Sequence, residues 1–278
     1  MKSEHPDVKV MLAVGGWNHG PGPFQAVVVD AGKRQRFIDT SLALLNKWGL
    51  DGLDIDWEYQ DAVGGTQEQL KGFSTLLREM SQAYHAQGKL LSAAVSANFN
   101  LIDANYEIPV LSETLDFINI MAYDLHGSWE KFTGHVAPLH SRPDEEGDEL
   151  HLNVEAVINR WIERGAAPQK INIGLVTYGR SFTLANPSVH DIGSPATGPG
   201  QIGQYVPESG DFAYAELCEQ ANQGLWQIYR NQAQAVPYAV KGDQWVGFDD
   251  EESISAKVRC LKLVLATRSA DCNVVCSL

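Results

Sequence analysis

Three carboxylic acids stand two residues apart in the segment 51–59, at Asp54, Asp56 and Glu58, with large apolar residues between them. In a β-strand, side chains two residues apart point to the same face, so the three acids would share one face. Repulsion between like charges in a cleft separates their pKa values, which keeps one acid protonated while another is ionised. Such a pair is suited to cleavage of an acetal, for example a glycosidic bond.

Two other interpretations of the acidic segment stay open on spacing alone. Clustered carboxylates at a strand end can bind a divalent cation, and they can also form a solvated acidic rim without chemistry.

Composition narrows the class of protein. The chain has 278 residues, enough for one α/β barrel domain, and a formal net charge of −14 from 21 basic and 35 acidic residues. It has no basic run, which argues against nucleic acid as a partner, and no apolar stretch of the roughly 20 residues needed to cross a membrane. Residues 1–7 lack the apolar core of a signal peptide. Cysteines occur only in the C-terminal quarter, and their disulfide pairing cannot be predicted: Cys218, Cys260, Cys272 and Cys276.

Strand-like and helix-like segments alternate along the chain. The apolar patterns predict strands at 8–14, 51–59, 90–95, 116–124 and 171–178. They predict helices at 33–48, after a capping box at Thr66 and Gln69, after Asn153, and from Asp250 to about Leu261. This alternation predicts an α/β fold with a parallel sheet, and polar residues at several strand ends favour a TIM barrel. No dinucleotide-binding or phosphate-binding glycine motif follows a strand, which argues against an open doubly wound sheet.

The alternation stops in the second half of the chain, where Gly, Pro and Ser become frequent. We predict a catalytic barrel at 1–182, an inserted α+β subdomain at 183–245, a return to a barrel helix at 246–262, and a divergent tail at 263–278. The tail matches neither an amphipathic helix nor a clear barrel strand.

Several segments together resemble one family. Asp51, Asp54, Asp56 and Glu58 match all four acids of the D-x-x-D-x-D-x-E motif of glycoside hydrolase family 18, the chitinases. Segments 9–17, 121–124, 174–182 and 245–250 resemble further motifs of that family, of the animal chitotriosidase type, and the resemblance runs from about Pro6 to Leu261. Ala13 stands where the family motif has a serine, which implies one hydroxyl fewer behind the acids. Taken singly, such residues have simpler explanations, since Asp124 could cap a helix and Arg180 could form a surface ion pair.

The resemblance implies a role for each matching residue. Glu58 would protonate the glycosidic oxygen, Asp56 would orient the N-acetyl group of the substrate, and Asp54 would share a proton with Asp56. This is the substrate-assisted route, which requires neither a metal nor a cofactor. The remaining residues would contact the sugar. Tyr123 would bond its acetamido oxygen, Met121 would pack beneath it, and three residues would bind it near the cleaved bond: Asp124, Tyr178 and Arg180. Trp17 and Trp129 would be aromatic platforms, and Glu216 would contribute from the insertion domain. The resemblance also implies chitin and chitooligosaccharides as partners, a secreted protein and a monomer.

The match to the family is incomplete at both ends. Family members have eight barrel strands, whereas the five predicted here correspond to the third through seventh, and no eighth-strand motif follows Leu261. We therefore expect a truncated, open sheet whose edges are the strand beginning at Val8 and the strand ending at Tyr178, with reduced stability and weak hydrolysis. Three functions remain open: endo-acting chitin hydrolysis, chitin binding without hydrolysis, and cleavage of N-glycans. The intact Glu58 favours the first over the second, and the insertion subdomain with Trp129 favours it over the third.

Overall fold

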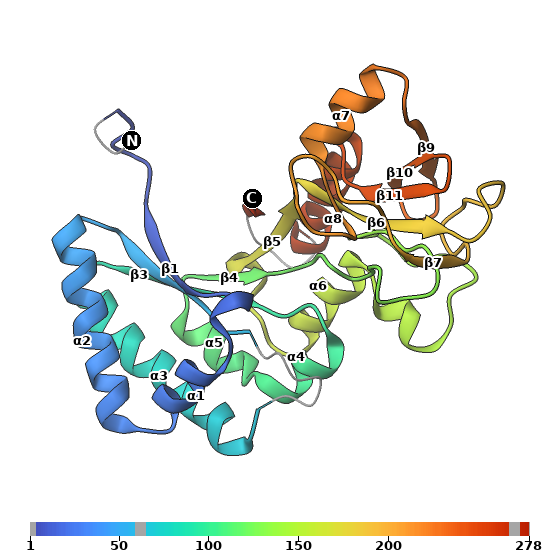
Figure 1. Ribbon diagram of the computed structural model, residues 1–278. Coiled ribbons are helices and arrows are strands. Elements are labelled where there is room, and N and C mark those ends of the chain that lie inside the picture. The colour runs from blue at the N-terminus through green and yellow to red at the C-terminus, as the bar shows by residue number, and fades with distance from the viewer. Residues whose placement is uncertain (1–3, 59–64, 267–272, 278) are drawn as a thin grey trace. The chain divides into compact units, whose positions relative to one another are not determined.

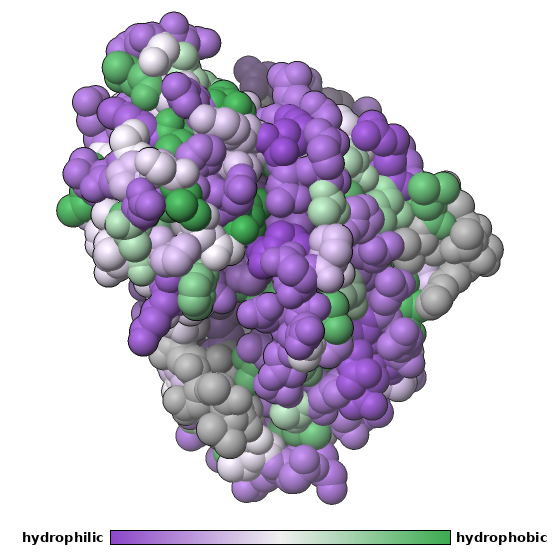
Figure 2. Space-filling view, turned by 90° about the vertical axis from the view of Figure 1, so that its right-hand side faces the viewer, coloured by the Kyte–Doolittle hydropathy of each residue, from purple (hydrophilic) through white to green (hydrophobic). Residues whose placement is uncertain are grey.

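The computed structural model describes residues 4–58, 65–266 and 273–277, and it divides into two compact units. Unit 1 comprises Met1–Met121 and Arg160–Asn172, and unit 2 comprises Ala122–Asn159 and Ile173–Leu278. None of the helices in the described ranges has the length and apolar character needed to cross a bilayer. The face drawn in Figure 2 is mostly hydrophilic, with hydrophobic residues scattered among polar ones, in keeping with the acidic composition.

A parallel sheet forms the centre of unit 1. Its strands β1 (Met11–Gly15), β2 (Gly52–Asp56), β3 (Leu90–Val95) and β4 (Phe117–Ile120) pair in chain order, each parallel to the next. Strand β5 (Ile171–Val176) begins in unit 1 and continues into unit 2. Strand residues such as Leu53, Ile55, Leu91 and Ile118 are fully buried, as expected for a parallel sheet covered by helices. The alternation of strands and helices predicted from the sequence is confirmed (Figure 1).

The helices of unit 1 begin and end where their sequence signals place them. Asp30 caps α2 (Ala31–Trp48) by accepting from the Lys33 amide, and Gly49 ends it in the left-handed conformation with φ 61°. Thr66 and Gln69 form the predicted capping box of α3 (Gln67–His85), whose apolar face is buried at Phe73, Leu77, Met80 and Tyr84. The shorter helices were not predicted: α1 (Gly22–Val28), α4 (Phe99–Asn105), α5 (Ile108–Thr114), and the 3-10 turns η1 (Trp17–His19) and η3 (Pro168–Lys170).

The edges of the parallel sheet differ in part from the prediction. The strand order is β1-β2-β3-β4-β5-β12, so among the described strands β1 is an edge, as predicted. Strand β5 is not an edge, because β12 (Asn273–Ser277) pairs with it and adds a sixth strand to the five predicted. The prediction that the tail matches no clear barrel strand, and that the strand ending at Tyr178 is an edge, was therefore wrong. The tail sequence contains two adjacent valines, a β-branched signal that is short and easily overlooked.

Helix α8 (Glu251–Ala266) also extends beyond its predicted end near Leu261. The following residues 262–266 contain no glycine or proline and, apart from Val264, are good helix formers, so no stop signal interrupts the helix there.

An antiparallel sheet forms most of unit 2. Its order is β7-β6-β11-β10-β9, with β8 also paired to β6. The strands are β6 (Tyr178–Leu184), β7 (Ala196–Pro199), β8 (Asp211–Ala213), β9 (Gln227–Asn231), β10 (Val236–Lys241) and β11 (Gln244–Phe248), and the helices are α6 (Val154–Glu163, shared with unit 1), α7 (Tyr214–Asn222), α8 and the turn η2 (Gly147–His151). The predicted strand 171–178 is thus part of two elements. Strand β5 ends at Val176, and Tyr178, after the bend at Thr177, is the first residue of β6 in the antiparallel sheet. The predicted domain bounds themselves stay a prediction.

Each face of this antiparallel sheet carries its own apolar cluster. One contains Phe182, Tyr238 and Trp245, and the other contains Phe212, Trp226 and Phe248. Neighbouring strand residues point to opposite faces, so β6 presents Arg180 to one side and Ser181 to the other. This strand therefore positions polar side chains on both faces of the sheet.

Candidate active site

The acidic segment lies at the carboxyl end of β2 in unit 1. The strand ends at Asp56, so alternation within the strand places only Asp54 and Asp56 on one face, and the prediction of three acids within the strand was wrong. Glu58 follows two residues later and is half-buried. Trp57 between them is 2% exposed and packs on Phe24 and Phe73, with ring centroids 5.8 and 5.2 Å away. This packing anchors the turn that carries Glu58.

Asp54 is held by donors from the adjacent strand β3 and from β4 beyond it. Ser92 Oγ donates to Asp54 Oδ1 at 2.5 Å, and Asn119 Nδ2 donates to the same oxygen at 2.9 Å. Asn172 Nδ2 in turn donates to Asn119 Oδ1 at 2.8 Å, which orients the Asn119 amide. On the other side of β2, Ala13 of β1 is in register with Asp54, and its methyl side chain has no hydroxyl to donate. The hydroxyl beside Asp54 thus comes from β3 instead of β1.

The pKa values of the two aspartates are raised. Burial raises the pKa of Asp54, while the bonds from Ser92 and Asn119 oppose that shift. Burial, and after it the charge of Asp54, raises the pKa of Asp56 to about 6. Asp56 Oδ1 is buried and has no hydrogen-bond partner within the described residues, which further disfavours its ionised form. With its pKa raised to about 6, Asp56 holds a proton in weakly acidic solution and is mostly ionised at pH 7 and above.

We expect that removal of the Ser92 hydroxyl raises the pKa of Asp54 further, because the ionised form loses a hydrogen bond. A hydrogen bond to a charged group is worth about 1.5–3 kcal/mol and favours the ionised form, so Ser92→Ala should raise the pKa of Asp54 measurably. Carboxyl-carbon NMR titration measures this value. Ser74→Ala is the matched control, because Ser74 is a buried serine whose hydroxyl has no partner among the described residues. An unchanged Asp54 titration in Ser92→Ala would contradict the assigned hydrogen bond.

Other predicted residues of unit 1 lie at the same edge of its sheet. Trp17 follows β1 in η1 and is 60% exposed, and Met121 follows β4 and is half-buried. Since β1, β2 and β4 are parallel, the residues after their carboxyl ends lie at one edge, where barrel enzymes carry their sites. Tyr106, which sequence reasoning missed, accepts from the Ser96 amide at 3.2 Å. Burial, and to a smaller extent the charges of Asp56 and Glu58, raise its pKa, so its hydroxyl stays neutral beside the acids.

A second group of predicted residues assembles in unit 2 around Asp124. Tyr178 Oη donates to Asp124 Oδ1 at 2.7 Å, and Arg180 Nε donates to the same oxygen at 2.8 Å. Arg180 also lies over the rings of Trp129 and Tyr178, 5.5 Å from each centroid, while Trp129 is 63% exposed. Asp124 adopts φ 55°, a left-handed conformation that is uncommon for a residue other than glycine. Such outliers occur where a side chain must be aimed.

Asp211 was not predicted, although it completes this group. Its carboxylate accepts from Arg180 Nη1, so the guanidinium is held between two acids. Burial raises the pKa of Asp211, and Arg180 opposes that shift. Tyr123 is half-buried and contributes to the raised pKa of Tyr178, for which burial is the main cause. No sequence signal marked Asp211, because it lies in the irregular segment between motifs.

Glu216 stands apart from this group. It lies on α7, is 3% exposed, and accepts from the backbone amides of Gln204 and Tyr205 at 2.7 and 3.1 Å and from Gln220 Nε2 at 2.8 Å. These bonds give it a structural role in anchoring the 204–205 backbone. Its role as a substrate contact stays a prediction.

Within the described ranges, no cluster of three or more His, Cys, Asp or Glu side chains could hold a metal ion. Cys218 and Cys260 are free thiols.

The chain is similar to known proteins over most of its length. Residues 1–263 match the family described as "Glycosyl hydrolases family 18". Chitotriosidase-1 of Mus musculus is 41% identical over 270 residues, which are 94% of this chain and 57% of that protein, so this chain spans little more than half of that relative's length.

Solved structures of chitinases and a chitinase-like protein are also similar. A Group IV chitinase of Ostrinia furnacalis in complex with allosamidin has a TM-score of 0.91 at 35% identity, covering 99% of this chain and 74% of that one. Human YKL-39, described as a pseudo-chitinase with retained chitooligosaccharide binding, has a TM-score of 0.88 at 37% identity, covering 98% and 74%. The predicted α/β fold of the TIM-barrel type is confirmed by these matches. The chain belongs to glycosyl hydrolase family 18.

Proposed function

We propose that this chain hydrolyses β-1,4-N-acetylglucosamine linkages in chitin and chitooligosaccharides, as a retaining endochitinase. The observation that supports this most is the partly buried pair of Asp54 and Asp56, in which the pKa of Asp56 is raised to about 6, two residues before Glu58. A proton-bearing acid next to an ionised one is the minimal equipment for acetal cleavage. The chitinase relatives supply the substrate class, and with it we propose a secreted monomer.

In the proposed reaction the substrate provides the nucleophile. Glu58 transfers its proton to the glycosidic oxygen as the bond to the anomeric carbon breaks, and the leaving sugar departs as an alcohol. The carbonyl oxygen of the neighbouring N-acetyl group attacks the same carbon and forms a cyclic oxazolinium ion. Water then opens this ring, with the ionised Glu58 accepting its proton, so the anomeric configuration is retained.

Each aspartate has a task in this scheme. Asp56 turns from Asp54 towards the N–H of the acetamido group and stabilises the positive charge of the oxazolinium ion. Asp54, fixed by Ser92 and Asn119, remains behind as the partner that can receive the shared proton. Tyr123 donates to the acetamido carbonyl, which aligns that oxygen for attack. Asp124, Tyr178 and Arg180 bind the sugar hydroxyls beside the cleaved bond, with Trp17 and Trp129 as stacking surfaces and Met121 beneath.

Binding without hydrolysis is the alternative function. It is suggested by the similarity to human YKL-39, a pseudo-chitinase by description. The retained Glu58 favours hydrolysis. Release of the fluorophore from a fluorogenic chitobioside distinguishes the two functions directly, because a protein that only binds releases none.

The mechanism also predicts which substrates and reagents matter. Exhaustive chelation should leave hydrolysis unchanged, because no step uses a cation. Substrates without the N-acetyl group at the cleaved sugar should show kcat/KM values at least about a hundredfold lower, because the intramolecular nucleophile is missing. Steady-state assays of acetylated and deacetylated oligosaccharides, with and without chelator, measure both effects. Recovery of activity on adding Ca²⁺ or Mg²⁺ after chelation would favour the metal-binding interpretation instead.

A further inference from the structure

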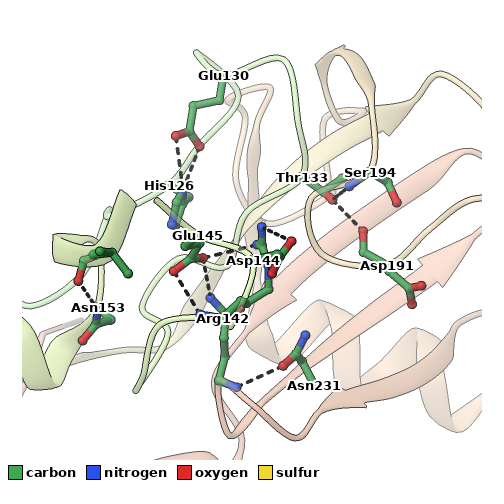
Figure 3. A network of polar contacts seen from close by, with 12 residues as sticks. His126, Glu130, Thr133, Arg142, Asp144, Glu145, Asn153, Asp191, Ser194 and Asn231 are labelled. Carbon is green, nitrogen blue, oxygen red and sulfur yellow. Dashed lines mark hydrogen bonds and ion pairs between the residues drawn. The ribbon is translucent and has the colours of Figure 1, made fainter. Parts of the chain in front are cut away.

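Unit 2 has a predominantly acidic cavity of about 270 Å³, and most of its charged groups pair with one another. His126 Nδ1 lies 3.1 Å from Glu130, and Arg142 contacts Asp144 at 3.0 Å and Glu145 at 3.4 Å (Figure 3). Because His126 and Arg142 are already bonded to these acids, we interpret the contacts as a structural network that supports the loops around the cavity.

A second cavity in unit 2, of about 180 Å³, has a different character. Phe212 and Trp226 form an apolar wall, with ring centroids 5.4 Å apart and each residue 7% exposed. The rest of the lining is rich in side-chain amides, which both donate and accept hydrogen bonds: Gln201, Gln204, Gln220 and Gln244. An apolar wall with a few polar groups is the usual composition of a site for a small molecule.

One polar group in this second cavity lacks a partner. Ser181 lines the cavity, is 2% exposed, and its Oγ has no hydrogen bond to any described residue. A buried hydroxyl without a partner destabilises the fold, so its presence needs an explanation. A ligand with an acceptor atom at this position would satisfy it.

The charges of the second cavity indicate a neutral ligand. Glu216 and Lys241 are its ionisable side chains, one of each sign. Glu216 is occupied by the 204–205 backbone amides, and Lys241 Nζ donates to Gln220 Oε1 at 3.3 Å. Gln220 Oε1 also accepts from Trp226 Nε1 at 2.9 Å, so the wall and the amides form one connected framework. No net charge remains for an ionic ligand to match.

We propose that this second cavity binds the acetamido group of an N-acetylated amino sugar without cleaving it. The Ser181 hydroxyl donates to the acetamido carbonyl, the methyl group packs on Phe212 and Trp226, and the side-chain amides of Gln201 and Gln204 bond the sugar hydroxyls. Because Ser181 and Arg180 are adjacent on β6, the cavity lies on the opposite face of the strand from the Arg180 group. The choice of an N-acetylated sugar rests on the proposed function, whereas the cavity and its unpaired hydroxyl do not.

Fluorine NMR of 5-fluorotryptophan-labelled protein tests this proposal at a single residue. The chain has seven tryptophans, and the Trp226 resonance is identified by its loss in Trp226→Phe. In a Glu58→Gln background, which prevents turnover, N-acetylglucosamine should shift the Trp226 resonance saturably. Glucosamine and glucose, which lack the acetyl group, should shift it only at much higher concentration. Ser181→Ala should weaken the N-acetylglucosamine titration by about tenfold, the equivalent of one hydrogen bond.

A stability measurement separates binding from folding. Ser181→Ala should leave the Tm of the sugar-free protein unchanged or raised, because the hydroxyl removed is unpaired. Ser253→Ala is the matched control, since Ser253 is a buried serine of unit 2 whose Oγ donates to Asp249 Oδ1 at 2.8 Å. That variant should lower Tm and leave the Trp226 titration unchanged.

The outcomes also separate this proposal from the proposed function. An unshifted Trp226 resonance, or equal shifts with glucose and N-acetylglucosamine, overturns the acetamido site even if the unsubstituted chain hydrolyses chitooligosaccharides. A shift that Ser181→Ala weakens supports the site even if the chain proves unable to hydrolyse them.

Discussion

Glu58→Gln is expected to lower the hydrolysis of chitooligosaccharides by about 10²–10⁴-fold or more, with little change in their binding. Glutamine keeps the size and hydrogen-bonding shape of the side chain, but it has no proton to give to the leaving oxygen. The effect should therefore appear in kcat, with KM nearly unchanged. Steady-state kinetics with a fluorogenic chitobioside, and calorimetric binding of a longer oligosaccharide, measure the two quantities separately.

Glu79→Gln is a suitable control for this substitution. Glu79 lies on α3 in unit 1 and pairs with Arg34 at 2.9 Å, with a side chain that is 40% exposed. Its replacement should leave turnover unchanged, because it lies on the helix and not at the carboxyl edge of the sheet. Near wild-type turnover by Glu58→Gln would show that another group donates the proton and would remove the basis of the proposed mechanism.

The sequence predicted the reactive acids because their spacing is local. Asp54 and Asp56 share a face through simple strand alternation, and the motif that extends to Glu58 is chemically restrictive. The capping box of Thr66 and Gln69 could also be predicted from the sequence, since the two residues lie within one helical turn. Elements of this kind need no tertiary information.

The residues that set the acids' properties were not predicted, because they come from distant parts of the chain. Ser92 and Asn119 meet Asp54 only when β2, β3 and β4 align in register, and Asp211 meets Arg180 only through the pairing of β8 with β6. No local pattern distinguishes these polar residues from ordinary strand residues. Strand β12 was missed for the same reason, since its assignment depends on the free edge of β5.

A second large effect is expected from a buried ion pair in unit 2. Lys257 on α8 has a fully buried side chain, and its Nζ lies 2.6 and 2.5 Å from the two carboxylate oxygens of Asp249, which follows β11. Burial lowers the pKa of Lys257, and the charge of Asp249 opposes this shift. Asp249→Ala would leave an ammonium group without a counter-charge in the apolar interior. We expect it to lower the free energy of unfolding by about 3–5 kcal/mol at neutral pH.

The charge of Lys257 makes this expectation specific and testable by urea unfolding. In Asp249→Ala the folded-state pKa of Lys257 falls further below its unfolded value, so the unfolded state binds more protons and the stability of the variant should rise with pH towards 10. The double variant Asp249→Ala with Lys257→Met should recover much of the loss, because methionine can fill the space without a charge. Lys9→Met, which removes an exposed partner 3.9 Å from Asp51, should change stability by less than about 1 kcal/mol. If the double variant were no more stable than Asp249→Ala, the loss would come from the missing Asp249 contacts themselves and not from the unpaired charge.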